Sequence, residues 1–373
     1  MRISGITTRI VELDAQPRFG HKPIPENRPK VWTYPMITIH TDEGIEGYSM
    51  GYGPHGDGPV IAEIILNIYG PDIKGKNPMH TEANWQMLMQ KNRHLYNISD
   101  AIVGVLDVAL WDIKAKALNA SICQVLGEYR NRIKTYATGR VYLPTPEEVH
   151  EEAKVMKDSG SHGYKLQLWQ GPEQDIPRFH AAREAVGGEF NLMQDSAGMY
   201  SFPEALKIGK VLDELDFYWY EEPINDRQLS LLKKLDDELK LPLLVGETLR
   251  ISELSALVEN KPFSRIRGDV LIKAGITGLQ KAFSMCDLVG INLEVHTAGA
   301  SFLDVANLHV ACANKNCEFV ELHHPVFRFG IKNSPLEPDQ EGYLTVPDDP
   351  GLGVIPDWDW IDDHTVNHQH IEY

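Results

Sequence analysis

The 373-residue sequence predicts an α/β fold in which a (β/α)8 barrel, or a close variant of it, follows a smaller α+β unit. Three observations support this prediction. Short apolar runs that end in an acid recur at a constant spacing, strand-length runs alternate with helical patterns from residue 133 onward, and the preceding part has antiparallel strands followed by helices. A doubly wound sheet is the alternative for the alternating part, but it would usually carry fewer strands.

The first part of the chain shows strand patterns and then helical patterns. Residues 1–14 alternate as a strand does, and the segments 34–40 and 44–50 are also strand-like. Since no helix separates these segments, we expect them to pair as antiparallel strands. From residue 58 to about residue 120 the apolar residues recur at helical spacing, with a helix cap near Ser99 or Asp100. This order predicts an α+β unit distinct from the part that follows.

From residue 133 the pattern becomes an alternation of strands and helices. A helix start is legible at 145–148, where a threonine, a proline and a glutamate occupy the cap, first and third positions. After residue 325 the alternation stops, and we expect the Pro- and Gly-rich end of the chain to return to the first unit. The predicted strands number eight: 133–138, 163–168, 190–194, 216–220, 242–246, 267–271, 291–295 and 318–321.

Three acids end successive predicted strands. Asp195, Glu221 and Glu247 each close a short apolar run, and they lie 26 residues apart, which is about the length of one βα unit. Acids in equivalent positions converge at the carboxyl ends of the strands, where barrel enzymes have their active sites. Converging carboxylates repel one another unless a cation lies among them, and hard oxygen ligands suit Mg²⁺. Any one of these acids could instead cap a helix or pair with a basic residue, but the repeated spacing favours a metal site.

The other strand ends offer further polar residues. Lys165 and Gln167 lie on one face of the second strand, and Glu321 ends the eighth. Asp269 and His296 are 27 residues apart, hence on neighbouring strands. A carboxylate beside an imidazole fixes the tautomer of the ring and raises its basicity, as a general base requires. The alternative is a core histidine with its hydrogen bonds satisfied.

The amino-acid composition excludes some classes of binding partner. The formal net charge of −17 argues against nucleic acid or an anionic membrane as a partner. An enzyme of anionic substrates with this charge would need a local positive centre, which a metal and a few basic residues would supply. No apolar run is long enough for a membrane span, and the first residues lack the apolar region of a signal peptide. The four cysteines are scattered without a close pair, which is typical of reduced thiols. We therefore expect a cytoplasmic protein.

These motifs together resemble the enolase superfamily, specifically its mandelate racemase-like branch. The resemblance covers nearly the whole chain and implies a modified TIM-type barrel, (β/α)7β, under an α+β capping domain built from both ends of the chain. The expected parts are 1–128 for the N-terminal part of the capping domain, 129–325 for the barrel, and 326–373 for the segment that returns to the cap. The residues that carry the resemblance are Asp195, Glu221-Glu222-Pro223, Gly246-Glu247, Asp269 with the segment 274–278, His296, and the helix at 107–116.

The resemblance also implies a chemistry. One Mg²⁺ per active site would be bound by Asp195, Glu221 and Glu247, and the enzyme would abstract the proton α to a carboxylate. The metal would hold the resulting enediolate, a dianion that needs a cation and hydrogen-bond donors near its oxygens. His296, paired with Asp269, would be the base. This superfamily is itself a standard example of a lysine or histidine base working with Mg²⁺.

Two departures from the family pattern narrow the reaction. Racemases and cycloisomerases of the branch typically have a second lysine where this chain has Gln167, and some dehydratases have a histidine where it has Ala197. Glutamine cannot accept a proton, so we expect dehydration of a sugar acid, an aldonate or aldarate, to a 2-keto-3-deoxy acid. Lys165 would bind the carboxylate or stabilise its charge, and Glu321 would hydrogen-bond a substrate or intermediate oxygen. The leaving hydroxyl would take its proton from the His296 imidazolium or from another acid.

Two alternatives stay open from the sequence. One is a racemase, epimerase or cycloisomerase that uses Lys165 as a second base, and the other is a non-catalytic binding protein on the same barrel. For substrate binding we expect Gln167 and residues of the first loops, namely Arg18, His21 and His55, although each loop residue could simply be solvated. By analogy with other barrel enzymes we expect a homo-oligomer.

Overall fold

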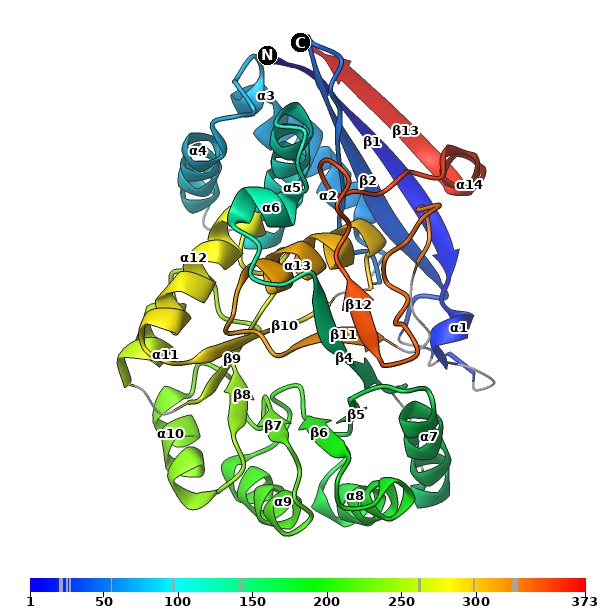
Figure 1. Cartoon of the computed structure of the whole chain (residues 1–373), viewed down its shortest axis with the longest axis vertical. Coiled ribbons are helices and arrows are strands. Elements are labelled where there is room, and N and C mark those ends of the chain that lie inside the picture. The colour runs from blue at the N-terminus through cyan, green and yellow to red at the C-terminus, as the bar shows by residue number, and fades with distance from the viewer. Residues whose placement is uncertain are drawn as a thin grey trace.

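The fold is described from a computed structural model of the chain. It describes residues 1–19, 23, 24, 26, 28–54, 56–95, 98–140, 143, 145–260, 263–297, 299–323 and 328–373. Figure 1 shows a barrel in the lower half of the molecule and, above it, a sheet flanked by helices, with both termini at the top of that sheet. The predicted combination of an α/β barrel with an α+β cap is confirmed.

The cap is an antiparallel sheet of four strands with helices against it. The strands are β1 (Ile3–Asp14), β2 (Val31–Thr41), β3 (Gly47–Met50) and β13 (Thr365–Glu372), in the order β13-β1-β2-β3. β1 pairs with β13 from Gly5↔Glu372 to Val11↔Thr365, so the last strand lies beside the first. The cap helices are α1 (Gln16–Phe19), α2 (Gly58–Ile64), the π-helical turn η1 (Ile65–Tyr69), α3 (Gly70–Ile73), α4 (Thr81–His94), α5 (Asp100–Ala117), α6 (Ile122–Leu126) and α14 (Trp358–His364).

Eight parallel strands form the barrel, and all eight predicted strands are present. In chain order they are β4 (Arg132–Thr138), β5 (Gly163–Gln167), β6 (Asn191–Asp195), β7 (Trp219–Glu221), β8 (Leu243–Val245), β9 (Arg265–Gly268), β10 (Asn292–Val295) and β11 (Phe319–His323). β11 pairs with β4 from Phe319↔Lys134 to His323↔Thr138, which closes the barrel. One strand was not predicted: β12 (Tyr343–Thr345) pairs antiparallel with the outer edge of β4.

Seven helices connect these strands in the described chain, which gives the expected (β/α)7β order. They are α7 (Pro146–Asp158), α8 (Pro172–Val186), α9 (Phe202–Glu214), α10 (Leu229–Glu238), α11 (Leu254–Asn260), α12 (Gly275–Leu288) and α13 (Ser301–Ala313). The predicted helix starts are confirmed. Thr145 and Glu148 form a capping box at α7, and the Ser99 hydroxyl accepts a hydrogen bond from the Ala101 amide at α5.

The two-residue period of the strands divides the barrel interior into layers. Five inward side chains form an apolar layer: Tyr136, Met193, Trp219, Leu244 and Phe319. Two residues further along β4, β6, β7 and β11, the same faces carry Thr138, Asp195, Glu221 and Glu321. The polar groups therefore lie at the carboxyl ends of the strands, above a closed apolar floor.

The cap is joined to the barrel through α5 and α12. Asp107 is fully buried, and its carboxylate accepts hydrogen bonds from the Thr277 amide and hydroxyl, both at 2.8 Å. The Trp111 indole donates to the same hydroxyl at 2.8 Å, and the Trp85 indole donates to the Ala274 carbonyl at 2.6 Å. These contacts explain why the motifs at 107–116 and 274–278 occur together. In the described residues, no helix is both long enough and apolar enough to cross a membrane.

Candidate active site

The three predicted acids lie at neighbouring strand ends. Asp195 is the last residue of β6 and Glu221 the last of β7, and the two are paired directly across the sheet. Glu247 follows β8 after Gly246, whose φ of +100° turns the chain at that point. The side chains of Asp195 and Glu221 are buried, whereas that of Glu247 is 21% exposed. The strand ends therefore present these carboxylates to one mouth of the barrel.

The acids raise one another's proton affinity. Burial, together with the charges of Glu221 and Asp195, raises the pKa of Glu247 to about 7. Burial and the neighbouring acids Glu247, Asp226 and Asp195 raise the pKa of Glu222 to about 11. Buried carboxylates that repel one another in this way require a cation for their charged form, and their oxygens are the ligands that Mg²⁺ prefers. The residues at this mouth therefore fit a Mg²⁺ site on Asp195, Glu221 and Glu247.

A buried lysine connects the acids. The Lys165 ammonium lies 3.1 Å from Glu221, 3.5 Å from Asp195 and 2.9 Å from Glu321. Burial alone would lower the pKa of Lys165, but the carboxylates of Glu221 and Glu321 hold it well above its usual value. Lys165 is thus a fixed positive charge among the acids, suited to an anionic substrate.

Arg267, on β9, fixes Glu221 from the other side. This fully buried guanidinium donates to both oxygens of Glu221, from Nε at 2.6 Å and from Nη2 at 2.5 Å. Burial alone would raise the pKa of Glu221, but Arg267 and Lys165 hold it below its usual value. Glu221 is therefore an anion of fixed orientation, with both oxygens already engaged by donors.

The predicted histidine–carboxylate pair is present. His296 Nδ1 lies 2.7 Å from Asp269 Oδ2, and His296 Nε2 lies 3.9 Å from Glu247 Oε1. With Nδ1–H donated to Asp269, Nε2 is the nitrogen that faces the acids. Burial alone would lower the pKa of His296, but Glu247 and the bond to Asp269 raise it to about 10. The geometry is that of a general base whose orientation is set by a carboxylate.

Lys273 fixes the segment that carries Glu247. Its fully buried ammonium donates to the carbonyls of Gly246, Glu247 and Leu249 at 2.6, 2.9 and 2.6 Å. Burial lowers the pKa of Lys273 to about 8. Because Lys273 follows Asp269 by four residues, this contact joins the loop after β9 to the loop after β8.

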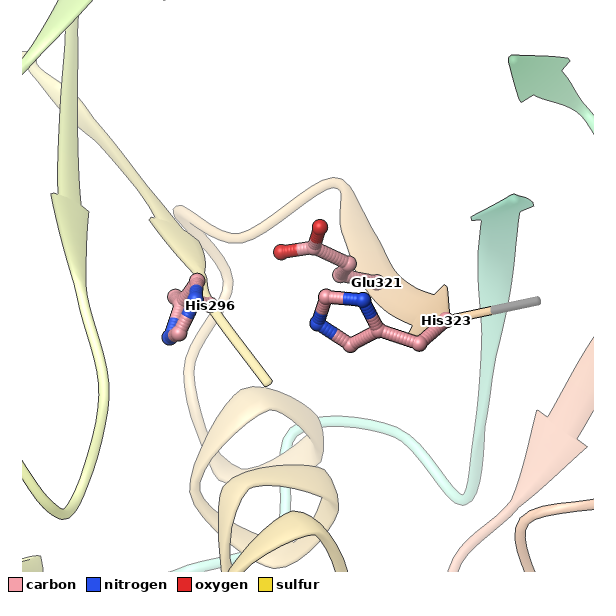
Figure 2. Close-up of side chains that lie close together, drawn as sticks. All are labelled: His296, Glu321 and His323. Atoms are coloured by element: carbon pink, nitrogen blue, oxygen red, sulfur yellow. The ribbon is translucent and has the colours of Figure 1, made fainter. Parts of the chain in front are cut away.

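Glu321 and His323, on β11, complete the mouth. Glu321 Oε1 binds Lys165 and the Thr138 hydroxyl, whereas Oε2 is buried and has no hydrogen-bond partner among the described residues. His323 Nε2 lies 2.7 Å from the Thr297 carbonyl. The ligand atoms of His296, Glu321 and His323 all lie within 4.8 Å of one another, and Figure 2 shows the three side chains facing one another from the two strand ends.

The structure describes only some of the residues that were predicted to bind the substrate. Gln167 lies beside the acids and its amide donates to Asp195 Oδ2 at 3.3 Å. Ala197 donates its amide to Asp195 Oδ1 at 2.9 Å and brings no side-chain acid there. Arg18 lies in α1, but its side chain falls outside the described part, and His21 and His55 lie outside the described residues altogether. Binding by these three loop residues stays a prediction.

Arg267 and His323 are two side chains at this mouth that the sequence did not identify as functional. The signal for both was the two-residue strand period, because Arg267 precedes Asp269 by two residues and His323 follows Glu321 by two. The eighth strand was predicted to end at Glu321, but in the structure it continues to His323. His323 therefore points to the same side as Glu321.

Comparison with known proteins identifies the family. Residues 24–127 match the family model of the mandelate racemase / muconate lactonizing enzyme N-terminal domain, and residues 148–360 match the enolase C-terminal domain-like model. The arabinonate dehydratase of Saccharolobus solfataricus is 30% identical over 332 residues, which cover 86% of this chain and 88% of that protein. The D-galactarolactone cycloisomerase of Agrobacterium fabrum is 27% identical, with 95% of this chain and 96% of that protein covered.

Solved structures agree with this assignment. A D-glucarate dehydratase from Agrobacterium tumefaciens, crystallised in complex with magnesium, has a TM-score of 0.86 and 28% identity. The match covers 98% of this chain and 100% of that one. The chain belongs to the enolase superfamily of enzymes, in its mandelate racemase-like branch.

Proposed function

We propose that this chain is a Mg²⁺-dependent dehydratase that converts an aldonate or aldarate to a 2-keto-3-deoxy acid. The observation that carries the proposal is that, among the described groups at the ends of the second and seventh barrel strands, His296 alone is arranged as a base. His296 is oriented by Asp269, whereas Lys165 is held protonated by Glu221 and Glu321, and Gln167 cannot accept a proton. A single base suits elimination of water better than proton exchange between two faces of a carbon atom.

The proposed roles follow from the contacts. One Mg²⁺ on Asp195, Glu221 and Glu247 would supply positive charge opposite the substrate carboxylate, where negative charge grows after loss of the α-proton. Lys165 would add a fixed positive charge beside that carboxylate, and Glu321 would accept a hydrogen bond from a substrate hydroxyl. His296 Nε2 would take the α-proton while Asp269 stabilises the imidazolium.

The high pKa of His296 depends on the charge of its neighbours. Glu247 contributes most to the increase, so neutralising the Glu247 charge lowers the pKa of His296 from about 10 toward its usual range. The base then becomes available near neutral pH. This coupling supports a working site in which Glu247 is a metal ligand.

Relatives support this substrate class. Proteins named arabinonate dehydratase, L-talarate/galactarate dehydratase and D-galactonate dehydratase are 30%, 26% and 28% identical to this chain over 85% or more of its length. Their names describe elimination of water from sugar acids, the reaction that the single base also favours.

The test is a screen of the purified protein with Mg²⁺ against aldonic and aldaric acids, with detection of 2-keto acids. We expect one or a few substrates, with activity that is lost in EDTA and in His296→Asn. The control is His150→Asn, an exposed histidine on α7 away from the site, which should retain full activity. Absence of a keto acid from every member of the panel would contradict the proposal.

The alternative is a racemase, epimerase or cycloisomerase, and the 27% identity to the D-galactarolactone cycloisomerase favours keeping it. The same panel in D₂O separates the two. Deuterium at the α-carbon without loss of water would support the alternative, and no exchange and no keto acid would remove support from both.

Three broader expectations stay proposals. The division of the chain into 1–128, 129–325 and 326–373 is supported by the pairing of β13 with β1, and limited proteolysis tests it. The four buried, unpaired cysteine thiols fit a cytoplasmic location. A homo-oligomer is expected by analogy, and light scattering measures it.

A further inference from the structure

His323 lies where a second proton carrier would be useful. It shares the inward face of β11 with Glu321, and its ring lies edge-on to that of His296, with 6.2 Å between ring centroids and an interplanar angle of 83°. One nitrogen of each ring and one oxygen of Glu321 lie within 4.8 Å of one another (Figure 2). The three groups approach one position from two neighbouring strands.

The ring of His323 is fixed in orientation. Its Nε2 donates to the Thr297 carbonyl at 2.7 Å, and the Thr297 hydroxyl donates to the Glu321 carbonyl at 3.1 Å. Because Thr297 directly follows His296, the backbone after β10 positions both imidazoles. With Nε2–H committed to a carbonyl, Nδ1 is the nitrogen of His323 at which a proton can be gained and lost.

The other candidate acids of this site are unsuitable. Position 167 is a glutamine and position 197 an alanine, so neither supplies a proton. Lys165 is bound to Glu221 and Glu321 and holds its proton tightly. Elimination of a hydroxyl is slow without a proton for the departing oxygen, and an acid separate from His296 allows that ring to act only as the base.

We propose that His323 is the catalytic acid that protonates the leaving hydroxyl, an inference that rests on the dehydratase function proposed above. One oxygen of Glu321 lies within 4.8 Å of a nitrogen of each ring, so this carboxylate can accept a hydrogen bond from a substrate hydroxyl at that position. That contact places the hydroxyl within reach of the His323 ring, and the Glu321 charge stabilises the protonated ring.

Loss of water from the substrate breaks two bonds, C2–H and C3–O. His296 takes the proton from C2, and the electron pair of that bond moves into the carboxylate to give the enediolate. When that pair returns, it forms the C2–C3 double bond as the C3–O bond breaks. The departing oxygen takes the proton of His323 and leaves as water. The enol loses its hydroxyl proton and gains a proton at C3, which gives the 2-keto-3-deoxy acid. His296 ends with one extra proton and His323 with one fewer, and exchange with solvent restores both.

The test compares wild type with His323→Gln on two substrates. The first is the sugar acid identified by the screen, and the second is its 3-deoxy-3-fluoro analogue, from which fluoride leaves without being protonated. We expect the variant to lose about 10²- to 10⁴-fold in kcat for loss of water, the usual contribution of a general acid. Fluoride release and exchange of the C2 proton in D₂O should stay within about threefold of wild type, because His296 is intact.

The controls separate the possible failures. His150→Gln should behave as wild type on both substrates. Unchanged loss of water in His323→Gln would overturn the proposal, and so would an equal loss with the fluoro analogue and in C2 exchange, because the variant would then have damaged the whole site. Wild type that releases neither water nor fluoride would instead refute the dehydratase function, whatever the variant does.

Discussion

Arg267 is a buried residue of the barrel interior that holds the carboxylate of Glu221 in place. Its guanidinium lies above the apolar layer, 5.9 Å from the ring centroids of both Tyr136 and Trp219, and its charge is compensated by Glu221. Removing one partner of a buried ion pair leaves the other charge unpaired in a medium that solvates it poorly. Glu221 therefore depends on Arg267 for its charge and for its orientation.

For Arg267→Met we expect a loss of about 3–5 kcal/mol in the free energy of unfolding, because Glu221 loses two charged donors while it remains buried. Urea denaturation measures this loss. The matched control is Arg227→Met, which removes an ion pair with Glu253 whose side chains are 50% and 37% exposed, and it should cost less than about 1 kcal/mol. Similar small losses in both variants would show that Arg267 does not support Glu221.

Mg²⁺ affinity should depend on pH through Glu247. Its pKa is raised to about 7, so below that pH the carboxyl is protonated and Mg²⁺ binding must displace the proton. We expect the Kd for Mg²⁺ to increase about tenfold per pH unit below pH 7. Calorimetry in buffers of different ionisation enthalpy would also show about one proton released per ion near pH 6.

The control for this prediction is Glu247→Gln, which cannot bind a proton at that position and should bind Mg²⁺ weakly at every pH. An affinity of the wild type that is constant between pH 5.5 and 8 would contradict the assignment of Glu247 as a ligand.

The sequence identified the predicted ligands and the predicted base of this site, but it did not identify the residues that hold them in place. Asp195, Glu221 and Glu247 could be placed because each ends an apolar run at a fixed spacing, and the same spacing joins Asp269 to His296. Arg267 and His323 were not identified, because their roles depend on which strand face they share. The sequence around β9 and β11 does not show where either strand begins or ends, because pairing with the neighbouring strands sets these boundaries.

The sequence also predicted the boundaries of strands β7 and β11 incorrectly. The strand predicted at 216–220 is Trp219–Glu221 in the structure, because Glu222 already has a φ of +40° and leaves the ladder. β11 is longer than predicted, because His323 still pairs with Thr138 of β4. Pairing between residues 185 positions apart leaves no trace in a local pattern.

Helix α5 of the cap packs directly against the loop that follows β9, and this loop begins at Asp269. A Cβ atom at Gly104 would lie 2.5 Å from the Val270 carbonyl oxygen and 2.8 Å from that of Leu271. Gly104→Ala should therefore destabilise the protein by about 1–3 kcal/mol through overpacking, although alanine favours a helix by about 1 kcal/mol. Because Val270 directly follows Asp269, we also expect a lower kcat.

The control is Gly188→Ala, where an added Cβ meets nothing within 4 Å. Thermal unfolding of the two variants measures the difference. A melting temperature of Gly104→Ala equal to or above that of the wild type would show that α5 can move away from the loop without cost.

The charge of the whole molecule opposes its proposed substrate. The net charge is −17, and at the barrel mouth Lys165 and Arg267 lie among several acids. At low salt an anionic sugar acid is repelled at long range, and salt screens that repulsion. We expect kcat/KM at saturating Mg²⁺ to increase as the ionic strength rises from about 0.01 to about 0.15 M, over which the Debye length falls from about 30 to about 8 Å.

In the same experiment kcat should stay constant, because it reports the bound complex. A kcat/KM that falls with added salt would show that the local positive charge dominates the approach of the substrate.

The pairing of the last strand with the first has a consequence for synthesis of the chain. β1 emerges from the ribosome early, but β13, its partner along one edge, is made about 350 residues later. At about 5–20 residues per second, that edge of β1 waits roughly 20–70 s for its partner. During this time it offers unpaired amide and carbonyl groups to any other extended chain. A nascent chain of this enzyme should therefore need protection by chaperones until its final residues are released.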